Sequence, residues 1–117
     1  MENYKGIDMY KVDIHSNRET VKDALYQLDV AIKIARRDKD KLLCIITGYG
    51  SHNTSHKIKI AIEEKLEEYV SNKFIKFWIR GNELDIFNKK YQEFPNNHKI
   101  PNEDKNVRNP GAIYISL

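Results

Sequence analysis

Apolar and polar residues alternate in some stretches of this chain and recur every three or four positions in others. Alternation over residues 10–15, and again from Phe74 to Arg80, predicts two strands with distinct faces. Leu42 to Thr47 is a nearly continuous apolar run, as expected of an internal strand covered on both faces. The stretch from Ala112 to Leu117 predicts a last strand at the C-terminus.

Two longer stretches have the spacing of a helix with one apolar face. The first begins after Thr20, three residues before Asp23, which resembles a capping box with Asp in place of Glu. The second ends near Ser71. The apolar faces are Val21, Ala24, Leu25, Leu28, Ala31, Ile32 and Ala35 in the first helix, and Ile58, Ala61, Ile62, Leu66, Tyr69 and Val70 in the second.

The region between the third and the last predicted strand differs from the rest of the chain. Its apolar residues Leu84, Phe87, Tyr91 and Phe94 have helical spacing. They predict a short third helix that begins behind an Asn82 cap and ends at Pro95. From Pro95 to Pro110 apolar residues are scarce, which predicts a long loop over the surface.

Strands that alternate with helices form right-handed βαβ units, so we expect an α/β fold with a largely parallel sheet that carries helices. A length of 117 residues suits one domain. In such sheets, ligands bind beyond the carboxyl ends of the strands. Two stretches fall at these ends: Asp13 to His15 after the first strand, and Thr47 to Gly50 after the second.

Composition and charge narrow the class of protein. Apolar residues make up 40% and charged residues 32% of the chain, which is typical of a globular domain. The longest apolar run, Leu42 to Ile46, is far shorter than the roughly 20 residues of a membrane span. Residues 1–6 lack the apolar core of a secretory signal, so we expect a cytoplasmic protein. The lone Cys44 is expected to be a buried, unreactive thiol, and the net charge of +3 fits a nucleic-acid partner without indicating one.

Asp13 and His15 are candidates for chemistry. Two residues apart on a strand, they leave the same face at Cα positions about 7 Å apart. The imidazole could move a proton near neutral pH, and the carboxylate could orient it, activate a nucleophile or bind a metal such as Mg²⁺ or Mn²⁺. The alternative is that the two residues form a structural pair.

The second turn and the helix behind it predict a phosphate site. Gly48 and Gly50 allow backbone N–H groups to approach an anion, and Tyr49 between them could stack on an unpaired base. Lys57 and Lys59 lie near the start of the second helix, although cations oppose the helix dipole there. The acids of its later half, Glu63, Glu64, Glu67 and Glu68, oppose the dipole as well. A bound phosphate backbone would offset this cost; a screened surface that tolerates the pattern is the alternative.

The order of these segments resembles a known family. The stretches VDIH (residues 12–15), ITGYG (46–50) and PGAIYISL (110–117), with the helix led by Thr20, are similar to the D-L-H-G-like segment, the H-G-K-G-like turn and the glycine-led last strand of small MutS-related (Smr) domains. The resemblance covers residues 10–117 and leaves 1–9 as an N-terminal extension. Residues 81–110 resemble an insertion with a short helix and a long loop.

The resemblance implies a two-layer α/β sandwich with a mixed four-stranded sheet, βαβαβ(α)β, like the C-terminal domain of bacterial translation initiation factor three. It also implies nucleic-acid binding and, in many members, endonuclease activity on DNA or RNA. Asp13 and His15 fall on the acidic and imidazole positions, and Gly48 and Gly50 on the turn glycines. Ser16, Thr47 and Tyr49 stand where Gly, His and Lys are common, so a proton donor and a phosphate contact of the family are missing.

These observations leave three hypotheses. The first is an endonuclease in which Asp13 and His15 are catalytic and Gly48, Tyr49, Gly50, Lys57 and Lys59 bind nucleic acid. The second is a non-catalytic module that binds nucleic acid or acts near ribosomes. The third is a protein-binding adaptor that uses the insertion at 81–110. Metal dependence, the choice between DNA and RNA, and the oligomeric state stay open.

Overall fold

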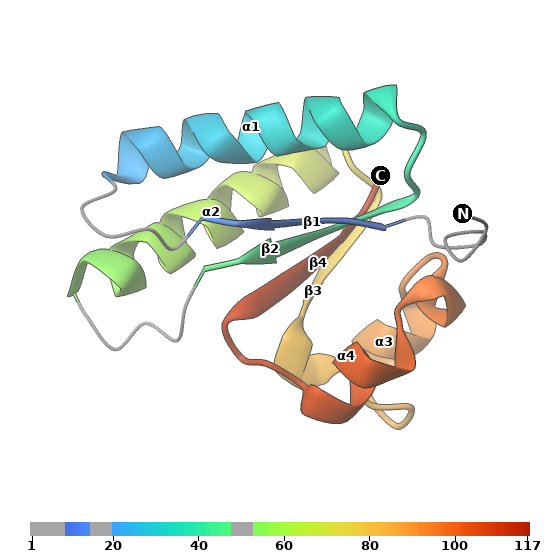
Figure 1. Cartoon of the computed structure of the whole chain (residues 1–117). Helices are drawn as coiled ribbons and strands as arrows, with labels where there is room; N and C mark the ends of the chain where they lie inside the picture. The colour runs from blue at the N-terminus through green and yellow to red at the C-terminus, as the bar shows by residue number, and fades with distance from the viewer. Residues whose placement is uncertain (1–8, 15–19, 48–52) are drawn as a thin grey trace.

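The computed structural model describes residues 9–14, 20–47 and 53–117. Within these residues, four strands form one mixed sheet in the order β1-β2-β4-β3 (Figure 1). The strands are β1 (Met9–Asp13), β2 (Leu42–Ile46), β3 (Phe77–Arg80) and β4 (Ala112–Ser116). The α/β class and the mixed four-stranded sheet expected from the sequence are confirmed.

The expectation of a largely parallel sheet is wrong, because only one of the three strand pairs is parallel. β1 and β2 are parallel, but β4 lies antiparallel between β2 and β3. The segment between β3 and β4 starts and ends at the same edge of the sheet, so β4 runs back against β3. Because of this arrangement, β1, β2 and β3 still point in one direction.

Two long helices, α1 (Val21–Arg37) and α2 (Asn53–Ser71), cover one face of the sheet (Figure 1). The predicted cap at Thr20 is confirmed, since its side chain accepts a hydrogen bond from the Asp23 backbone N–H at 3.0 Å. The predicted apolar faces are also confirmed. Buried residues of these faces are Ala24, Leu28, Ala31, Ile32 and Ala35 in α1, and Ile58, Ile62 and Leu66 in α2.

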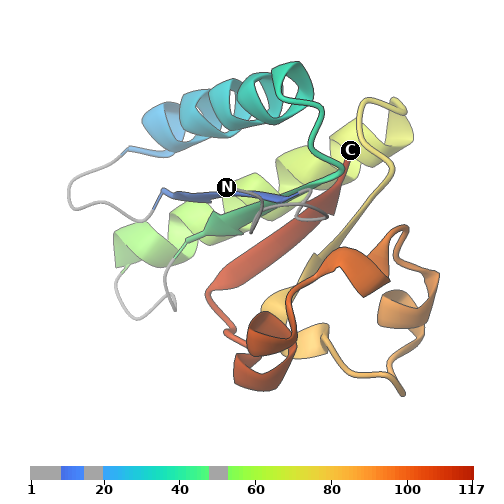
Figure 2. The same cartoon turned by 45° about the vertical axis from the view of Figure 1, so that its right-hand side comes forward.

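Residues 81–110 cover the opposite face of the sheet as a chain of short elements (Figure 2). These are the 3-10 turns η2 (Gly81–Glu83) and η3 (Asn97–Lys99) and the helices α3 (Lys89–Glu93) and α4 (Asn102–Val107). The sheet therefore has a core on each side. Leu43 and Ile45 of β2 pack toward α1 and α2, whereas Leu42 and Cys44 pack toward residues 81–110.

The predicted third helix is wrong in extent. Its cap is Asn88 rather than Asn82, because the Asn88 side chain accepts from the N–H groups of Lys90 and Tyr91 at 2.8 and 3.3 Å. Before it, the Asp85 carboxylate accepts from the Phe87 N–H at 3.0 Å and forms a turn. Phe87 is consequently 84% exposed instead of lying on a buried helix face.

The predicted surface loop from Pro95 to Pro110 is also wrong. This stretch contains α4 and packs on the sheet, with Ile100 and Asp104 buried. Ile100 supplies an apolar contact and Asp104 a paired carboxylate, although the stretch is polar as a whole.

The third strand is shorter than the alternation from Phe74 to Arg80 predicts. The N–H groups of Phe74 and Ile75 bond to the Tyr69 carbonyl at 2.8 and 3.3 Å, so both residues belong to the turn after α2. Ile75 therefore packs in the core under the long helices, while Ile79 packs in the opposite core.

Candidate functional site

The segments that carry the predicted site begin at one edge of the sheet. Asp13, the last residue of β1, is the register partner of Ile46, the last residue of β2, and Ile46 is the partner of Ala112 at the start of β4. The chain leaves β1 and β2 at neighbouring positions of this carboxyl edge. His15 and the turn Gly48–Gly50, with Tyr49, follow those strand ends but lie outside the described residues.

Asp13 is exposed and lies on the sheet face covered by residues 81–110. Side chains alternate along a strand, so Asp13 shares its face with Met9 and Lys11, and Met9 packs in the core on that side. α2, with Lys57 and Lys59, covers the other face. The structure thus brings Asp13 and the two lysines to one region of the fold but places them on different sides of the sheet.

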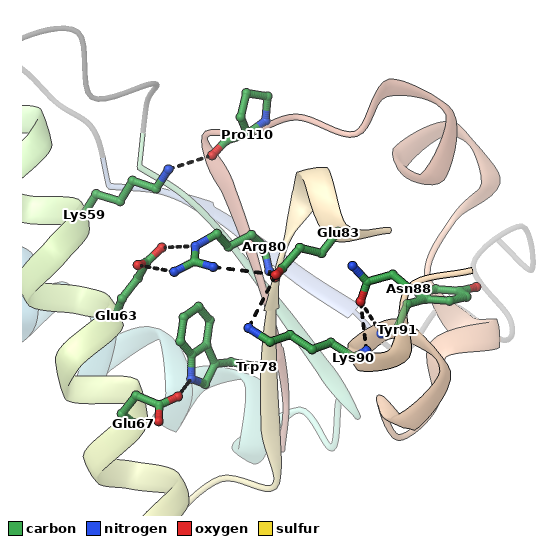
Figure 3. A network of polar contacts seen from close by, with 10 residues as sticks. All are labelled: Lys59, Glu63, Glu67, Trp78, Arg80, Glu83, Asn88, Lys90, Tyr91 and Pro110. Atoms are coloured by element: carbon green, nitrogen blue, oxygen red, sulfur yellow. Dashed lines mark hydrogen bonds and ion pairs between the residues drawn. The ribbon is translucent and has the colours of Figure 1, made fainter. Parts of the chain in front are cut away.

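The two lysines differ in what they contact. Lys57 is exposed. Lys59 is half-buried and donates a hydrogen bond to the carbonyl of Pro110 at 3.1 Å, just before β4 (Figure 3). Lys59 therefore ties α2 to the carboxyl edge, and Lys57 is the better placed of the two to meet a phosphate in solution.

Thr47, which directly follows β2, is buried in the backbone network of this edge. Its N–H donates to the Gly111 carbonyl at 2.7 Å, and its hydroxyl donates to the same oxygen at 3.2 Å. The side chain is 0% exposed. These two bonds join the end of β2 to the residue that precedes β4, and the hydroxyl is closed off from solvent.

A network of charged side chains surrounds Arg80 at the end of β3 (Figure 3). Its guanidinium makes two hydrogen bonds of 2.9 Å to the carboxylate of Glu63 from α2. Glu83 lies 3.6 Å from the same guanidinium and 3.4 Å from the ammonium of Lys90 in α3. The hydrogen bond to Glu63 raises the pKa of Arg80, so this side chain is a fixed cation committed to its neighbours.

Three of the four glutamates of α2 have a polar partner, which lies on β3 for Glu63 and Glu67 and within α2 itself for Glu68. Glu63 binds Arg80, Glu67 accepts from the Trp78 indole N–H at 2.6 Å, and Glu68 lies 3.5 Å from Lys65. Their position against the helix dipole is offset by these contacts, so a bound anion is not required to explain it. Trp78 packs against the core under α2.

A polar cluster surrounds the buried carboxylate of Asp104 on the sheet face that residues 81–110 cover, which is also the face of Asp13. The Asp104 carboxylate accepts from the Tyr114 hydroxyl at 2.5 Å and from the Lys11 ammonium at 3.1 Å. Burial alone would lower the pKa of Lys11, but the hydrogen bond and the charge of Asp104 outweigh it and raise that pKa. Sequence reasoning missed this cluster; the one available signal was a tyrosine in the middle of an otherwise aliphatic last strand.

No group of three or more His, Cys, Asp or Glu side chains that could hold a metal occurs within residues 9–14, 20–47 and 53–117. None of the helices in those ranges is long and apolar enough to pass through a bilayer. Comparison with known proteins returned no matching family model, no matching curated protein and no matching solved structure.

Proposed function

We propose that this protein is a nucleic-acid-binding domain similar to Smr domains, and that it hydrolyses phosphodiester bonds of RNA or DNA in the cytoplasm. The observation that supports the proposal is the register of the first two strands, which puts Asp13 beside Ile46. The segments bearing His15 and the glycine turn leave the sheet next to each other. The strand order β1-β2-β4-β3 is compatible with a sandwich like the C-terminal domain of translation initiation factor three.

In this proposal, His15 moves the proton and the carboxylate of Asp13 orients it, activates the nucleophile or binds a divalent cation. The backbone of Gly48–Gly50 and the ammonium of Lys57 bind phosphates, and Tyr49 stacks on a base. Asp13 is exposed, so its carboxylate can meet a substrate at the edge of the sheet.

The test uses the full chain and its Asp13→Ala and His15→Ala variants. Labelled single-stranded RNA, duplex DNA and a hairpin are incubated with Mg²⁺, with Mn²⁺ or with EDTA. We expect the wild type to cleave at least one substrate, and both variants to lose cleavage while retarding nucleic acid nearly as well as the wild type. Cleavage that survives both substitutions would refute the assignment of the site.

A non-catalytic nucleic-acid module is the second candidate, and Thr47 favours it. The buried hydroxyl in place of a turn histidine removes one proton donor from the site. In that case the purified chain cuts none of the substrates under any of the ion conditions, yet still retards at least one of them.

A further inference from the structure

A cavity of about 160 Å³ lies between the sheet and α4, next to the carboxyl edge. Its inner wall is formed by Ile46 at the end of β2 and by the buried residues Ala112 and Tyr114 of β4. Because Ile46 is the register partner of Asp13, the cavity lies beside the proposed phosphodiester site. Its outer wall comes from α4 and from the residues that lead into β4.

The size of the cavity restricts its occupant. An engineered protein cavity of about 150 Å³ accommodates benzene. The volume here is about 160 Å³ and the cavity opens to solvent, so one six-membered ring fits within its walls and a purine would leave one of its two rings outside. The side chains of Ile46, Ala112 and Val107 offer apolar surface for the faces of such a ring.

The rim of the cavity carries both hydrogen-bond donors and hydrogen-bond acceptors. Lys11 supplies an ammonium donor and Glu103 a carboxylate acceptor. The Asn109 side-chain oxygen accepts from the Gly111 N–H at 2.8 Å, so its amide nitrogen is the group available to donate. Pyrimidine bases present carbonyl oxygens that accept hydrogen bonds and a ring N–H or an amino group that donates them.

The position of Asn109 is held tightly. Gly81, where the segment leaves β3, packs against the Asn109 backbone so closely that an added Cβ would lie 2.0 Å from the Asn109 carbonyl oxygen. On the other side of the cavity, Asp104 is fixed by Tyr114 and Lys11. Packing and hydrogen bonds therefore make this a preformed cavity.

We propose that this cavity binds a single pyrimidine base of a nucleic-acid strand, next to the phosphodiester bond that the adjacent edge acts on. The adjacency rests on the proposed function, whereas base binding itself requires no cleavage. Residues 81–110 would then determine which base lies beside the bond.

The test is a titration of the full chain with uridine, cytidine, adenosine and guanosine 5′-monophosphates, followed by backbone amide chemical shifts. We expect the two pyrimidine nucleotides to shift the amides of Val107, Asn109 and Ala112 and to bind about tenfold more tightly than the purine nucleotides. Equal binding of all four nucleotides, or no binding, would overturn the proposal.

Two variants and a matched control locate the site. Asn109→Asp keeps the acceptor for the Gly111 N–H but replaces the amide donor with a carboxylate oxygen, and should weaken pyrimidine binding about tenfold. Val107→Trp fills the rim from an exposed position and should have a similar effect if the first variant fails to fold. Asn106→Asp makes the same charge change at an exposed position of α4 outside the cavity, and should bind like the wild type.

The two proposals fail in distinguishable ways. Asp13→Ala should abolish cleavage and leave nucleotide binding unchanged. Pyrimidine binding without any cleavage by the wild type would refute the nuclease and retain the base pocket. The opposite outcome is that Asn109→Asp and Val107→Trp cleave as well as the wild type and that the cut sites show no preference for pyrimidines. That outcome would refute the base pocket and retain the nuclease.

Discussion

Individual residues owe their chemistry to neighbours that are distant in the sequence. Asp104 belongs to a polar stretch, yet it is buried because Tyr114 and Lys11 satisfy its carboxylate. Burial raises the pKa of Tyr114, and the negative charges of Cys44 and Asp104 in their ionised forms raise it further. Cys44 is completely buried beside this cluster, as its apolar surroundings in the sequence predict.

The pH dependence of stability at Cys44 follows from its burial. Burial raises the pKa of its thiol to about 12, whereas the thiol of the unfolded chain has a pKa of about 8.5. Above pH 8.5 the unfolded chain loses this proton before the folded chain does, so this contribution to the free energy of unfolding falls as the pH rises toward 12. The decline per ionised thiol is about 1.4 kcal/mol per pH unit.

We therefore expect Cys44→Ala to lose stability less steeply than the wild type between pH 9 and 11, measured by urea unfolding at each pH. Alkylation supplies an independent check. The folded wild type should resist iodoacetamide at pH 8 and react once urea unfolds it. Parallel pH profiles of the two proteins would contradict the expectation.

At the scale of elements, α2 is attached to the sheet by charge as well as by its apolar face. Glu63 and Glu67 reach Arg80 and Trp78 of β3, and Glu83 continues the network to Lys90 on the far side of that strand (Figure 3). The 3.6-residue period of α2 is visible in the sequence, but the partners of its polar face are not. The sequence positions of the charges along this helix therefore do not show whether the helix binds an external anion.

The Arg80–Glu63 contact should be measurable by a double-mutant cycle. With Arg80→Gln and Glu63→Gln singly and together, we expect a coupling free energy of about 1 kcal/mol, because the two-pronged contact is partly shielded from water. The side chains of Lys65 and Glu68, a pair within α2 whose carboxylate is exposed, form the matched control. Their cycle should give about 0.5 kcal/mol or less. Equal coupling in both cycles would show that the first contact is no more than a surface pair.

At the scale of the whole molecule, cations are found at both edges of the sheet. Lys57 lies at the start of α2 by the carboxyl edge, and Lys59 is held there by the Pro110 carbonyl. At the opposite edge, Lys41 precedes β2 and Lys76 precedes β3, joined to the end of β4 through backbone hydrogen bonds of 3.1 and 2.9 Å. The two edges can be compared with equivalent substitutions.

Lys57→Gln should lower the slope of log binding constant against log salt by about 1, because one phosphate contact is lost. Lys76→Gln removes the same charge at the opposite edge and should leave the slope unchanged. The measurement is fluorescence anisotropy of a labelled RNA or DNA strand over a range of salt concentrations. If only Lys76→Gln lowered the slope, the nucleic acid would bind at the amino edge of the sheet, away from Asp13.

The amino-acid sequence by itself determined the two long helices, the covered second strand and the class of fold. The cap at Thr20, the apolar stripes of α1 and α2 and the doubly covered β2 all follow from patterns that are local, so they could be read from the order of residues. Only the tertiary structure decided that β4 enters the sheet antiparallel and that residues 81–110 pack on it. It also brought Lys11, Asp104 and Tyr114 together and formed the cavity beside them. These features depend on contacts between residues far apart in the chain. The periodic pattern within one segment carries no information about such contacts.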